Sequence, residues 1–479
     1  MWIDLYLDPG VGRRTSAELF GQIRHAIVTG RLAPGDRLPP SRQLATELGV
    51  ARSTVTTVYG RLGAEGFVEG RAGAGTVVAA VATRPASDAG RGRRPSALAP
   101  RRSPAAGVTL LAAAPGPSPV RIDLRTGSPD PALFPVADWR RVVTGVVRHP
   151  PPGYGPAAGL PELRQAIARW IGRWRGVDAD PAQVVVTAGA QHAFELCAQV
   201  LVAPGDVVAL EDPGYPPARA LFERHGARIA PVPVDGEGMV VDRVPTAARL
   251  VLVTPSHQAP TAVVMSAARR RALLARAGAA GMAVIEDDYD TEYRYVDRPL
   301  EPLHLLDVEG RVIYVGTFSK SLSPSLRLGF AVLPEPLVGA VERVRTLSDH
   351  GPPHLLQAAL ARFLSDGFHD THLRRVGREY RRRHRVLIDG LDDLARAGLV
   401  SAPVGSAGLH VAVGLPPDTD EAQVVAALAG RGVAVNGTAG CWHRPSPPPG
   451  LSIGFGLATP AALDEAIGLL GEVLAMGPA

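Results

Sequence analysis

From about Ile122 to the end of the chain, short apolar runs typical of buried strands alternate with longer stretches typical of helices. The runs are VVVTAG (184–189), DVVALED (206–212), RLVLVTPS (249–256), MAVIEDD (282–288), RVIYVGTF (311–318) and RLGFAVLP (327–334). This alternation predicts an α/β domain with a mostly parallel sheet. Ligands bind such sheets at the carboxyl ends of the strands, so functional residues are expected there.

Lys320 is the single lysine among 51 lysine and arginine residues. Arginine serves wherever a positive charge suffices, whereas only a lysine amine readily forms a Schiff base. Lys320 follows the expected strand 311–319, Arg327 comes seven residues later, and Asp287 ends another expected strand. Amine, cation and carboxylate are the groups that a pyridoxal phosphate site needs. The alternatives are that Lys320 survives by chance and that Asp287 and Asp288 are ordinary turn residues.

A second candidate for the phosphate lies at residues 187–192, where a strand is expected to end and a helix to begin. Backbone amides and the helix dipole favour an anion at such a position. We therefore expect Gly189, Ala190 and Gln191 to contact the phosphate.

Residues 15–79 predict a small separate unit with the helix-turn-helix pattern of DNA-binding proteins. Leu19, Ile23 and Ile27 have the spacing of an amphipathic helix, and two short helices are expected after Pro40 and after Gly49. Residues 67–78 predict two short strands around a glycine turn. Helix pairs of this kind also occur in proteins that do not bind DNA, so the pattern alone leaves both interpretations open.

The complete string LPPSRQLATELGVARSTVTTVYGRLGAEGFVEGRAGAGT, residues 38–76, resembles the GntR family of winged helix-turn-helix regulators. That resemblance implies a double-stranded DNA operator as partner. The residues that it places on DNA are Ser41, Arg42, Arg52, Thr54, Arg71, Gly73, Gly75 and Thr76. Ala51 stands where a capping serine is usual, which is expected to weaken the second short helix of the pair.

The remaining motifs, TAGAQHAFE, EDPGYPPARA, TPSHQAPT, IEDDYDTEYRY and GTFSKSLSPSLRLGF, resemble in this order the fold-type I aminotransferase domain of MocR-type regulators. The resemblance implies pyridoxal 5'-phosphate as cofactor and a homodimer, often head to tail. It makes Lys320 the Schiff-base lysine, with Asp287 at the pyridine nitrogen and Tyr289 at the ring oxygen. It places Thr317 and Arg327 at the phosphate, together with Tyr154 of the other subunit, and Tyr215 near the cofactor ring.

Two departures from the aminotransferase pattern bear on activity. Where aminotransferases carry an arginine for the substrate carboxylate in LRLGF, this chain has Ser452 in LSIGF. Where a stretch commonly ends in PTG, this chain has Pro260-Thr261-Ala262, with no asparagine before the proline. A carboxylate ligand would need another cation, for which Arg444 is the candidate. Whether the domain performs any transamination is left open.

The chain is expected to have three parts: a DNA-binding domain (1–79), a linker rich in Pro, Ala and Arg (80–120) and a cofactor domain (121–479). No apolar stretch long enough for a membrane span is expected, which predicts a cytoplasmic protein. Cys197 and Cys441 stand far apart, and no metal site is expected. His192, His257 and His443 are interpreted as structural or polar lining.

The sequence thus predicts a transcription regulator that senses a small amine, an amino acid or pyridoxal phosphate itself. Two alternatives stay open. One is an active aminotransferase with a vestigial DNA-binding head, which the intact Lys320, Asp287 and Arg327 favour and Ser452 disfavours. The other is a structural DNA-binding protein without cofactor.

Overall fold

The structure is a computed structural model that describes residues 15–71, 75–80, 120–151, 153–295 and 301–476. The chain divides into two compact units, Met1–Arg101 and Arg102–Ala479, with a boundary outside the described residues. Nearly all of the expected linker, 80–120, also lies outside them, so the domain limits stay a prediction. No helix in the described ranges is long and apolar enough to cross a membrane.

The N-terminal unit is a winged helix-turn-helix. It contains α1 (Thr15–Val28), α2 (Ser41–Glu47) and α3 (Arg52–Ala64), followed by the antiparallel strands β1 (Val68–Arg71) and β2 (Gly75–Val78). Leu19, Ile23 and Ile27 of α1 are buried with Val55 and Leu62 of α3, as their helical spacing predicts. The hairpin expected over residues 67–78 is present as β1 and β2, and Gly73 lies outside the described residues.

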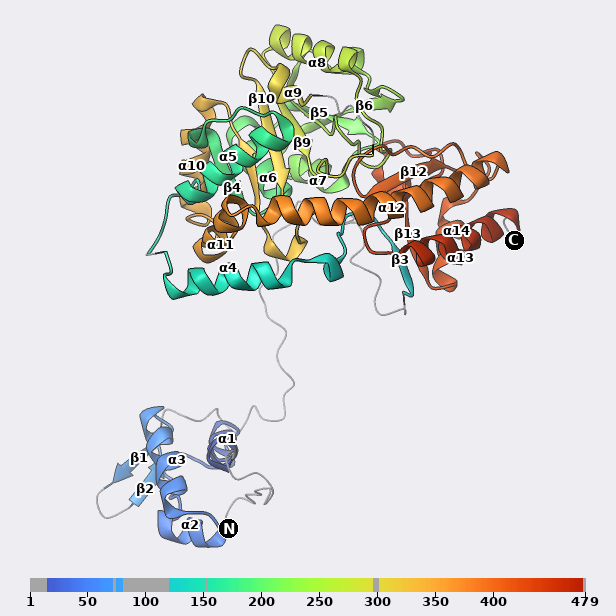
Figure 1. Ribbon diagram of the computed structural model, residues 1–479. Helices are drawn as coiled ribbons and strands as arrows, with labels where there is room; N and C mark the ends of the chain where they lie inside the picture. Colours follow the sequence, from blue (N-terminus) through green and yellow to red (C-terminus); the bar gives the residue numbers. More distant parts are fainter. Residues whose placement is uncertain (1–14, 72–74, 81–119, 152, 296–300, 477–479) are drawn as a thin grey trace. The chain divides into compact units, whose positions relative to one another are not determined.

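The second unit is built on an eight-stranded sheet (Figure 1). Its strands are β4 (Val184–Thr187), β5 (Val207–Asp212), β6 (Arg228–Asp235), β7 (Gly238–Met239), β8 (Ala248–Val253), β9 (Ala283–Asp288), β10 (Val312–Thr317) and β11 (Gly329–Val332). Their order is β4-β11-β10-β9-β8-β5-β6-β7. Neighbours are parallel from β10 to β6, whereas β11 runs antiparallel to both β10 and β4, and β7 antiparallel to β6. The expected mostly parallel sheet is confirmed.

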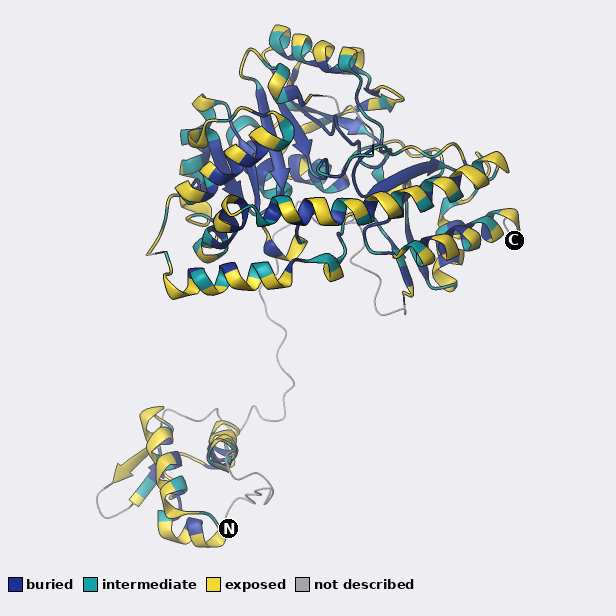
Figure 2. Cartoon of the chain, viewed as in Figure 1, coloured by how far each residue is buried: buried dark blue, intermediate teal, exposed yellow. Residues whose placement is uncertain are grey.

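Helices pack on both faces of this sheet. They are α5 (Pro161–Arg175), α6 (Ala190–Leu201), α7 (Pro216–Arg224), α8 (Ala267–Ala280), α9 (Leu303–Leu306), α10 (Glu335–Ser348) and α11 (His354–Ser365), and α4 (Val136–Arg148) packs on α11. Strand β10 shows the two faces, because successive side chains of a strand point to opposite sides. Ile313 and Val315 join the core of α6, α7 and α10, whereas Tyr314 joins that of α5 and α11. Figure 2 shows the strands buried between helices that expose one face.

A second, smaller sheet follows the long helix α12 (Phe368–Arg396), which Figure 1 shows running from the helices of the large sheet toward the C-terminal helices. Its order is β12 (His410–Gly414), β14 (Gly450–Gly454), β13 (Val433–Gly437) and β3 (Ile122–Leu124), covered by α13 (Glu421–Gly430) and α14 (Pro460–Ala475). Strand β3 pairs in parallel with β13, far away in sequence. This pairing holds the first described residues of the second unit against its C-terminal part.

Candidate functional site

The predicted cofactor residues meet at one edge of the large sheet. Thr317 at the end of β10 pairs with Gly329 of β11, and Gly329 pairs with Thr187 at the end of β4. On the other side of β10, Val315 pairs with Asp287 of β9. The register therefore brings the segments after three strands together, although they lie far apart along the chain.

Lys320 lies in the turn after β10, three residues beyond the strand. Its amine donates a hydrogen bond of 2.5 Å to the Gly127 carbonyl, and Tyr293 donates its hydroxyl proton to the Lys320 carbonyl at 3.2 Å. Burial lowers the pKa of Lys320, Arg327 lowers it further, and Asp290 and Asp287 oppose both effects. A lowered pKa makes the neutral form of the amine, which is the nucleophilic form, easier to reach than in water.

Asp287 presents a buried carboxyl group with an unused oxygen. Its Oδ1 has no hydrogen-bond partner. Burial, reinforced by Asp288, raises the pKa of Asp287 to about 8, against the attraction of Lys320. A buried carboxylate is stabilised by a cationic partner, and a protonated pyridine nitrogen is one.

Two of the residues expected at the phosphate, Gly189 and Arg327, have positive φ angles and lie next to each other. Gly189, with φ 94°, precedes α6, and Arg327, with φ 50°, donates to the Ala188 carbonyl. A Cβ at Gly189 would stand 3.3 Å from the Arg327 guanidinium, so glycine leaves room for that side chain. The Thr317 hydroxyl donates to Ser319 Oγ at 2.9 Å in the same region.

Ala190, Gln191 and Tyr215 are at least partly buried, whereas Tyr154 is exposed. Ala190 begins α6, and Gln191 donates to the Pro217 carbonyl at 2.9 Å while its Oε1 lacks a partner. Tyr215 precedes α7. Burial raises the pKa of its hydroxyl, Asp287 raises it further, and Arg327 lowers it. Tyr154 is 92% exposed, with its ring against His350.

Tyr289 follows β9, and its hydroxyl lies 3.4 Å from His257 Nδ1. Burial raises the pKa of Tyr289 well above its ordinary value, so the phenol stays protonated and can donate a hydrogen bond. His257 also bonds Asp290, and its ring lies against that of His410. Asp290 and His410 received no role from the sequence, and neither did the Gly127 carbonyl that accepts from Lys320.

The donor set fits pyridoxal phosphate. An amine, an unpaired buried carboxyl oxygen, an arginine beside a glycine that opens a helix, and a phenol occur together, and each matches one group of the cofactor. Gly127 leaves room for the amine, because a Cβ there would approach Lys320 Nζ to 3.3 Å. Assignment of each residue to a cofactor atom remains a prediction.

The departures from the aminotransferase pattern are also located. Ser452 is buried in β14, where it pairs with Ala412 of β12 and Asn436 of β13. The Arg444 guanidinium lies over the Trp442 ring at 4.1 Å, on the segment before β14. Arg444 is thus held by an aromatic face, and its proposed role toward a carboxylate remains a prediction.

In the N-terminal unit the predicted DNA contacts lie on one helix pair and a hairpin. Arg42 and Arg52 are exposed, Thr54 is half-buried, and Arg52 Nε donates to Ser41 Oγ at 3.4 Å. The structure therefore joins the starts of α2 and α3 through two of the predicted residues.

The remaining DNA candidates belong to the hairpin. Arg71 and Gly75 are exposed and paired across β1 and β2, and Thr76 pairs with Gly70. Arg71 also forms an exposed ion pair with Glu69. Gly73 lies outside the described residues.

Two family models match the chain. "Bacterial regulatory proteins, gntR family" covers residues 15–78, and "Aminotransferase class I and II" covers residues 135–467. An archaeal alanine:glyoxylate aminotransferase superposes with a TM-score of 0.70 at 29% identity, covering 74% of this chain and 91% of its own. The kynurenine aminotransferase of Pyrococcus horikoshii gives 0.70 at 27% identity, covering 75% and 92%. The fold and site define a winged helix-turn-helix protein with an aminotransferase-like domain of the pyridoxal phosphate class, which confirms the expected cofactor.

Relatives of full length specify the family. "Probable rhizopine catabolism regulatory protein MocR" of Rhizobium meliloti is 35% identical, covering 97% of this chain and 95% of its own. The pyridoxine biosynthesis regulator PdxR of Corynebacterium glutamicum is 32% identical, covering 99% of both. The regulator TauR of Rhodobacter capsulatus is 38% identical, covering 81% and 82%. The chain belongs to the MocR-type subfamily of GntR family transcription regulators.

Proposed function

We propose that this regulator binds pyridoxal phosphate at Lys320 and changes its hold on operator DNA when the cofactor site meets a small amine, an amino acid or pyridoxal phosphate itself. The observation that carries the proposal is the unpaired buried Oδ1 of Asp287 near the one lysine of the chain. An orphaned buried carboxyl oxygen is costly unless a ligand completes it.

The proposed roles follow from the surroundings of each side chain. Pyridoxal phosphate, when bound, supplies an aldehyde that captures amines reversibly. Lys320 holds its amine on the Gly127 carbonyl, in a setting that lowers its pKa. Asp287 would bind the pyridine nitrogen and Tyr289 the ring oxygen. Tyr215 would lie near the ring.

The phosphate would be held by Thr317, Arg327 and the start of α6, namely Gly189, Ala190 and Gln191. Arginine and helix N-terminal amides are the usual partners of phosphate. Tyr154 is proposed to reach the phosphate of the partner subunit, in a homodimer whose arrangement is proposed to be head to tail. Its exposure on its own chain supports a role toward a second chain.

The DNA side rests on the exposed residues of α2, α3 and the hairpin. Ser41, Arg42, Arg52 and Thr54 are proposed to contact the operator, with Arg71, Gly73, Gly75 and Thr76 on the wing. Because the operator is chromosomal, we place the protein in the cytoplasm. An effector can shift DNA affinity only by its differential affinity for the DNA-bound and free states.

The deciding experiment is a binding titration of the cofactor-free protein on DNA from upstream of its own gene, with and without pyridoxal phosphate. A change of about 5- to 150-fold, the range of typical coupling energies, would make the cofactor the signal. If the affinity stays constant, amines are titrated against the loaded protein. Lys320→Ala is the matched control and should lose any response that requires covalent capture.

Borohydride reduction tests the site directly. Mass spectrometry should find the pyridoxyl group on Lys320, and a reduced adduct at another position would refute the assignment. Since the chain has no other lysine, the result is unambiguous.

A catalytic aminotransferase remains the second candidate, since Lys320, Asp287 and Arg327 are all in place. Ser452 disfavours it, because a buried serine offers no charge to a substrate carboxylate. Turnover is measured with a panel of amino donors. Sustained turnover together with no DNA binding would refute the regulator proposal.

A further inference from the structure

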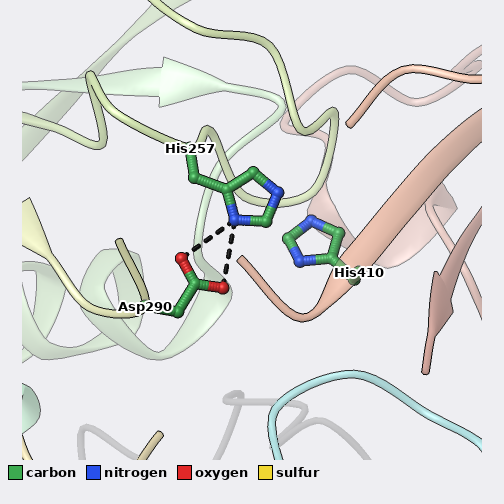
Figure 3. A group of neighbouring side chains, drawn as sticks. All are labelled: His257, Asp290 and His410. Carbon is green, nitrogen blue, oxygen red and sulfur yellow. Dashed lines mark hydrogen bonds and ion pairs between the residues drawn. The ribbon is translucent and has the colours of Figure 1, made fainter. Parts of the chain in front are cut away.

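Three buried polar side chains meet where the large sheet adjoins the small one. His257 lies in the loop after β8, Asp290 lies two residues after β9, and His410 begins β12. One ligand atom from each lies within 4.8 Å of the other two (Figure 3). The side chains of His257 and Asp290 are 0% and 3% exposed. Within the described ranges no other group of three such residues is this close.

The hydrogen bonds of His257 determine which of its nitrogens is free. Nδ1 lies 2.9 Å and 3.0 Å from the two oxygens of Asp290, and the Leu409 amide donates to Asp290 Oδ2 at 3.1 Å. A carboxylate only accepts hydrogen bonds, so Nδ1 carries the proton when the ring is neutral. Nε2 is left as a bare lone pair, buried and without partner.

His410 is in the same condition. Its Nε2 is also buried and has no hydrogen-bond partner. The two imidazole rings have centroids 4.1 Å apart, and Figure 3 shows the free nitrogen of His257 turned toward the His410 ring. Two buried ring nitrogens thus lie side by side without a hydrogen-bond partner, an arrangement that a shared cation would relieve.

We propose that His257 and His410 bind a divalent transition metal ion of the zinc class through Nε2, with Asp290 orienting the His257 ring through Nδ1. Imidazole is a favoured ligand of zinc, cobalt, nickel and copper. A carboxylate behind a ligating histidine is the usual way to fix its tautomer and ring orientation. Two nitrogens bound to one ion at about 2.1 Å stand at most about 4.2 Å apart, and the ring centroids of His257 and His410 are 4.1 Å apart.

The site would link both sheets beside the cofactor candidates. His257 and Asp290 belong to loops of the large sheet, whereas His410 belongs to the small one. The Tyr293 carbonyl accepts from the Gly408 amide at 2.8 Å, so the two segments already run together here. The inference does not depend on pyridoxal phosphate, because the three residues lie close in the cofactor-free protein.

The test is a metal titration of the full-length, cofactor-free protein after dialysis against a chelator. Cobalt(II) is the probe, read by its visible absorption, and zinc(II) competes with it. We expect one ion per chain and loss of that ion in His410→Ala and His257→Ala. Asp290→Asn should weaken binding by about 10- to 100-fold, as for other residues behind a ligand. His149→Ala, at an exposed histidine after α4, should bind like the wild type.

Because these residues are buried, folding is checked by thermal unfolding without metal, and His410→Gln is compared as a polar replacement. Zinc should raise the unfolding midpoint of the wild type and of His149→Ala, but not of folded His410 variants. A wild type that binds no ion, or binding that persists unchanged in folded His257 and His410 variants, overturns the proposal. In that case the two nitrogens share a proton or a water molecule.

Discussion

Gly408 is the residue that allows the small sheet to approach His257 and Asp290. Its φ is 71°, and a Cβ there would overlap His257 Nδ1 and Asp290 Oδ2. Gly408→Ala should destabilise the protein by about 1 to 2 kcal/mol for the left-handed backbone and by about 1 to 3 kcal/mol more for overpacking. Chemical denaturation measures the loss.

Gly281→Ala is the matched control for Gly408. Gly281 has φ 68° at the end of α8, and a Cβ there would meet nothing within 4 Å. It should therefore show the backbone cost alone. Equal losses for both variants would show that the contacts around Gly408 are not restrictive.

Glu211 makes stability depend on pH. Burial raises its pKa from 4.5 to about 7, although Thr254 and Gln258 donate to its carboxylate. The folded protein therefore holds a proton between pH 4.5 and 7 that the unfolded chain releases, so the contribution of Glu211 to stability falls as pH rises through this window. Glu211→Gln should be more stable than the wild type by about 3 kcal/mol above pH 8 and similar to it below pH 4.5.

The measurement for Glu211 is urea denaturation of the cofactor-free protein at several pH values. Glu223→Gln, at an exposed position on α7, controls for the loss of a carboxylate. A constant difference between Glu211→Gln and the wild type across pH would contradict the prediction.

At the residue scale the sequence was most informative where a side chain ends a strand. Thr317 ends β10, Asp287 is the next-to-last residue of β9, and Lys320 follows β10, so the strand pattern brought them to one edge. The Gly127 carbonyl could not be found in this way, because a backbone acceptor has no sequence signature. His410 could not either, because it enters from a sheet that the pattern of residues 184–334 does not contain.

Among the elements, α3 begins without a cap. Ala51 has extended backbone angles, φ −66° and ψ 142°, and makes no side-chain hydrogen bond to the helix. Ala51→Ser should stabilise α3 by about 1 kcal/mol, because the hydroxyl can accept from a free amide of the first turn. Hydrogen exchange of the α3 amides in the full-length protein measures the change.

Asp420 provides the reverse experiment for the cap. Its carboxylate caps α13 by accepting from the amides of Ala422 at 2.9 Å and Gln423 at 3.2 Å. Asp420→Ala should therefore destabilise α13 by about 1 kcal/mol, which is seen as faster hydrogen exchange of its amides. If Ala51→Ser slows exchange in α3 but Asp420→Ala leaves exchange in α13 unchanged, the effect of the serine on α3 is not that of a helix cap.

Helix α3 also carries two of the residues, Arg52 and Thr54, that are proposed to contact the operator. If Arg52 neutralises one phosphate, Arg52→Ala should reduce the slope of log affinity against log salt concentration by about 1. Fluorescence anisotropy at several salt concentrations gives the slope. Arg396→Ala, at an exposed position at the end of α12, should leave it unchanged. A weaker affinity at unchanged slope would place Arg52 on a base or in a structural role.

The elements themselves were predictable from periodicity, but not all of their partners. Each of the six apolar runs became a strand of the large sheet. The run 327–334 became β11, which is antiparallel, because periodicity carries no information on strand direction. Strand β3, at residues 122–124, is too short to show a period, and its pairing with β13 depends on contacts across nearly the whole unit.

For the whole molecule, the open question is whether one chain suffices to make a cofactor site. Lys320, Asp287 and Arg327 come together within a single chain, whereas Tyr154 is 92% exposed and contacts only His350 among the ring contacts of the described residues. A tyrosine that serves the partner's phosphate would have this exposure in an isolated chain. The proposed dimer therefore predicts that each cofactor site uses Tyr154 of the partner subunit, whereas a single-chain site would use its own Tyr154 or none.

Heterodimers that combine one Lys320→Ala chain with one Tyr154→Phe chain test this prediction. If Tyr154 acts in the partner subunit, one site carries both changes and the other carries neither, so half of the sites bind pyridoxal phosphate like the wild type. Each homodimer lacks such a site, and loss of a hydrogen bond to phosphate should weaken the Tyr154→Phe homodimer about 10-fold or more. Chains with two different tags are purified together, and borohydride trapping on Lys320 counts the wild-type-like sites. If Tyr154 served its own chain, every site of the heterodimer would carry one change, and the wild-type-like half would be absent.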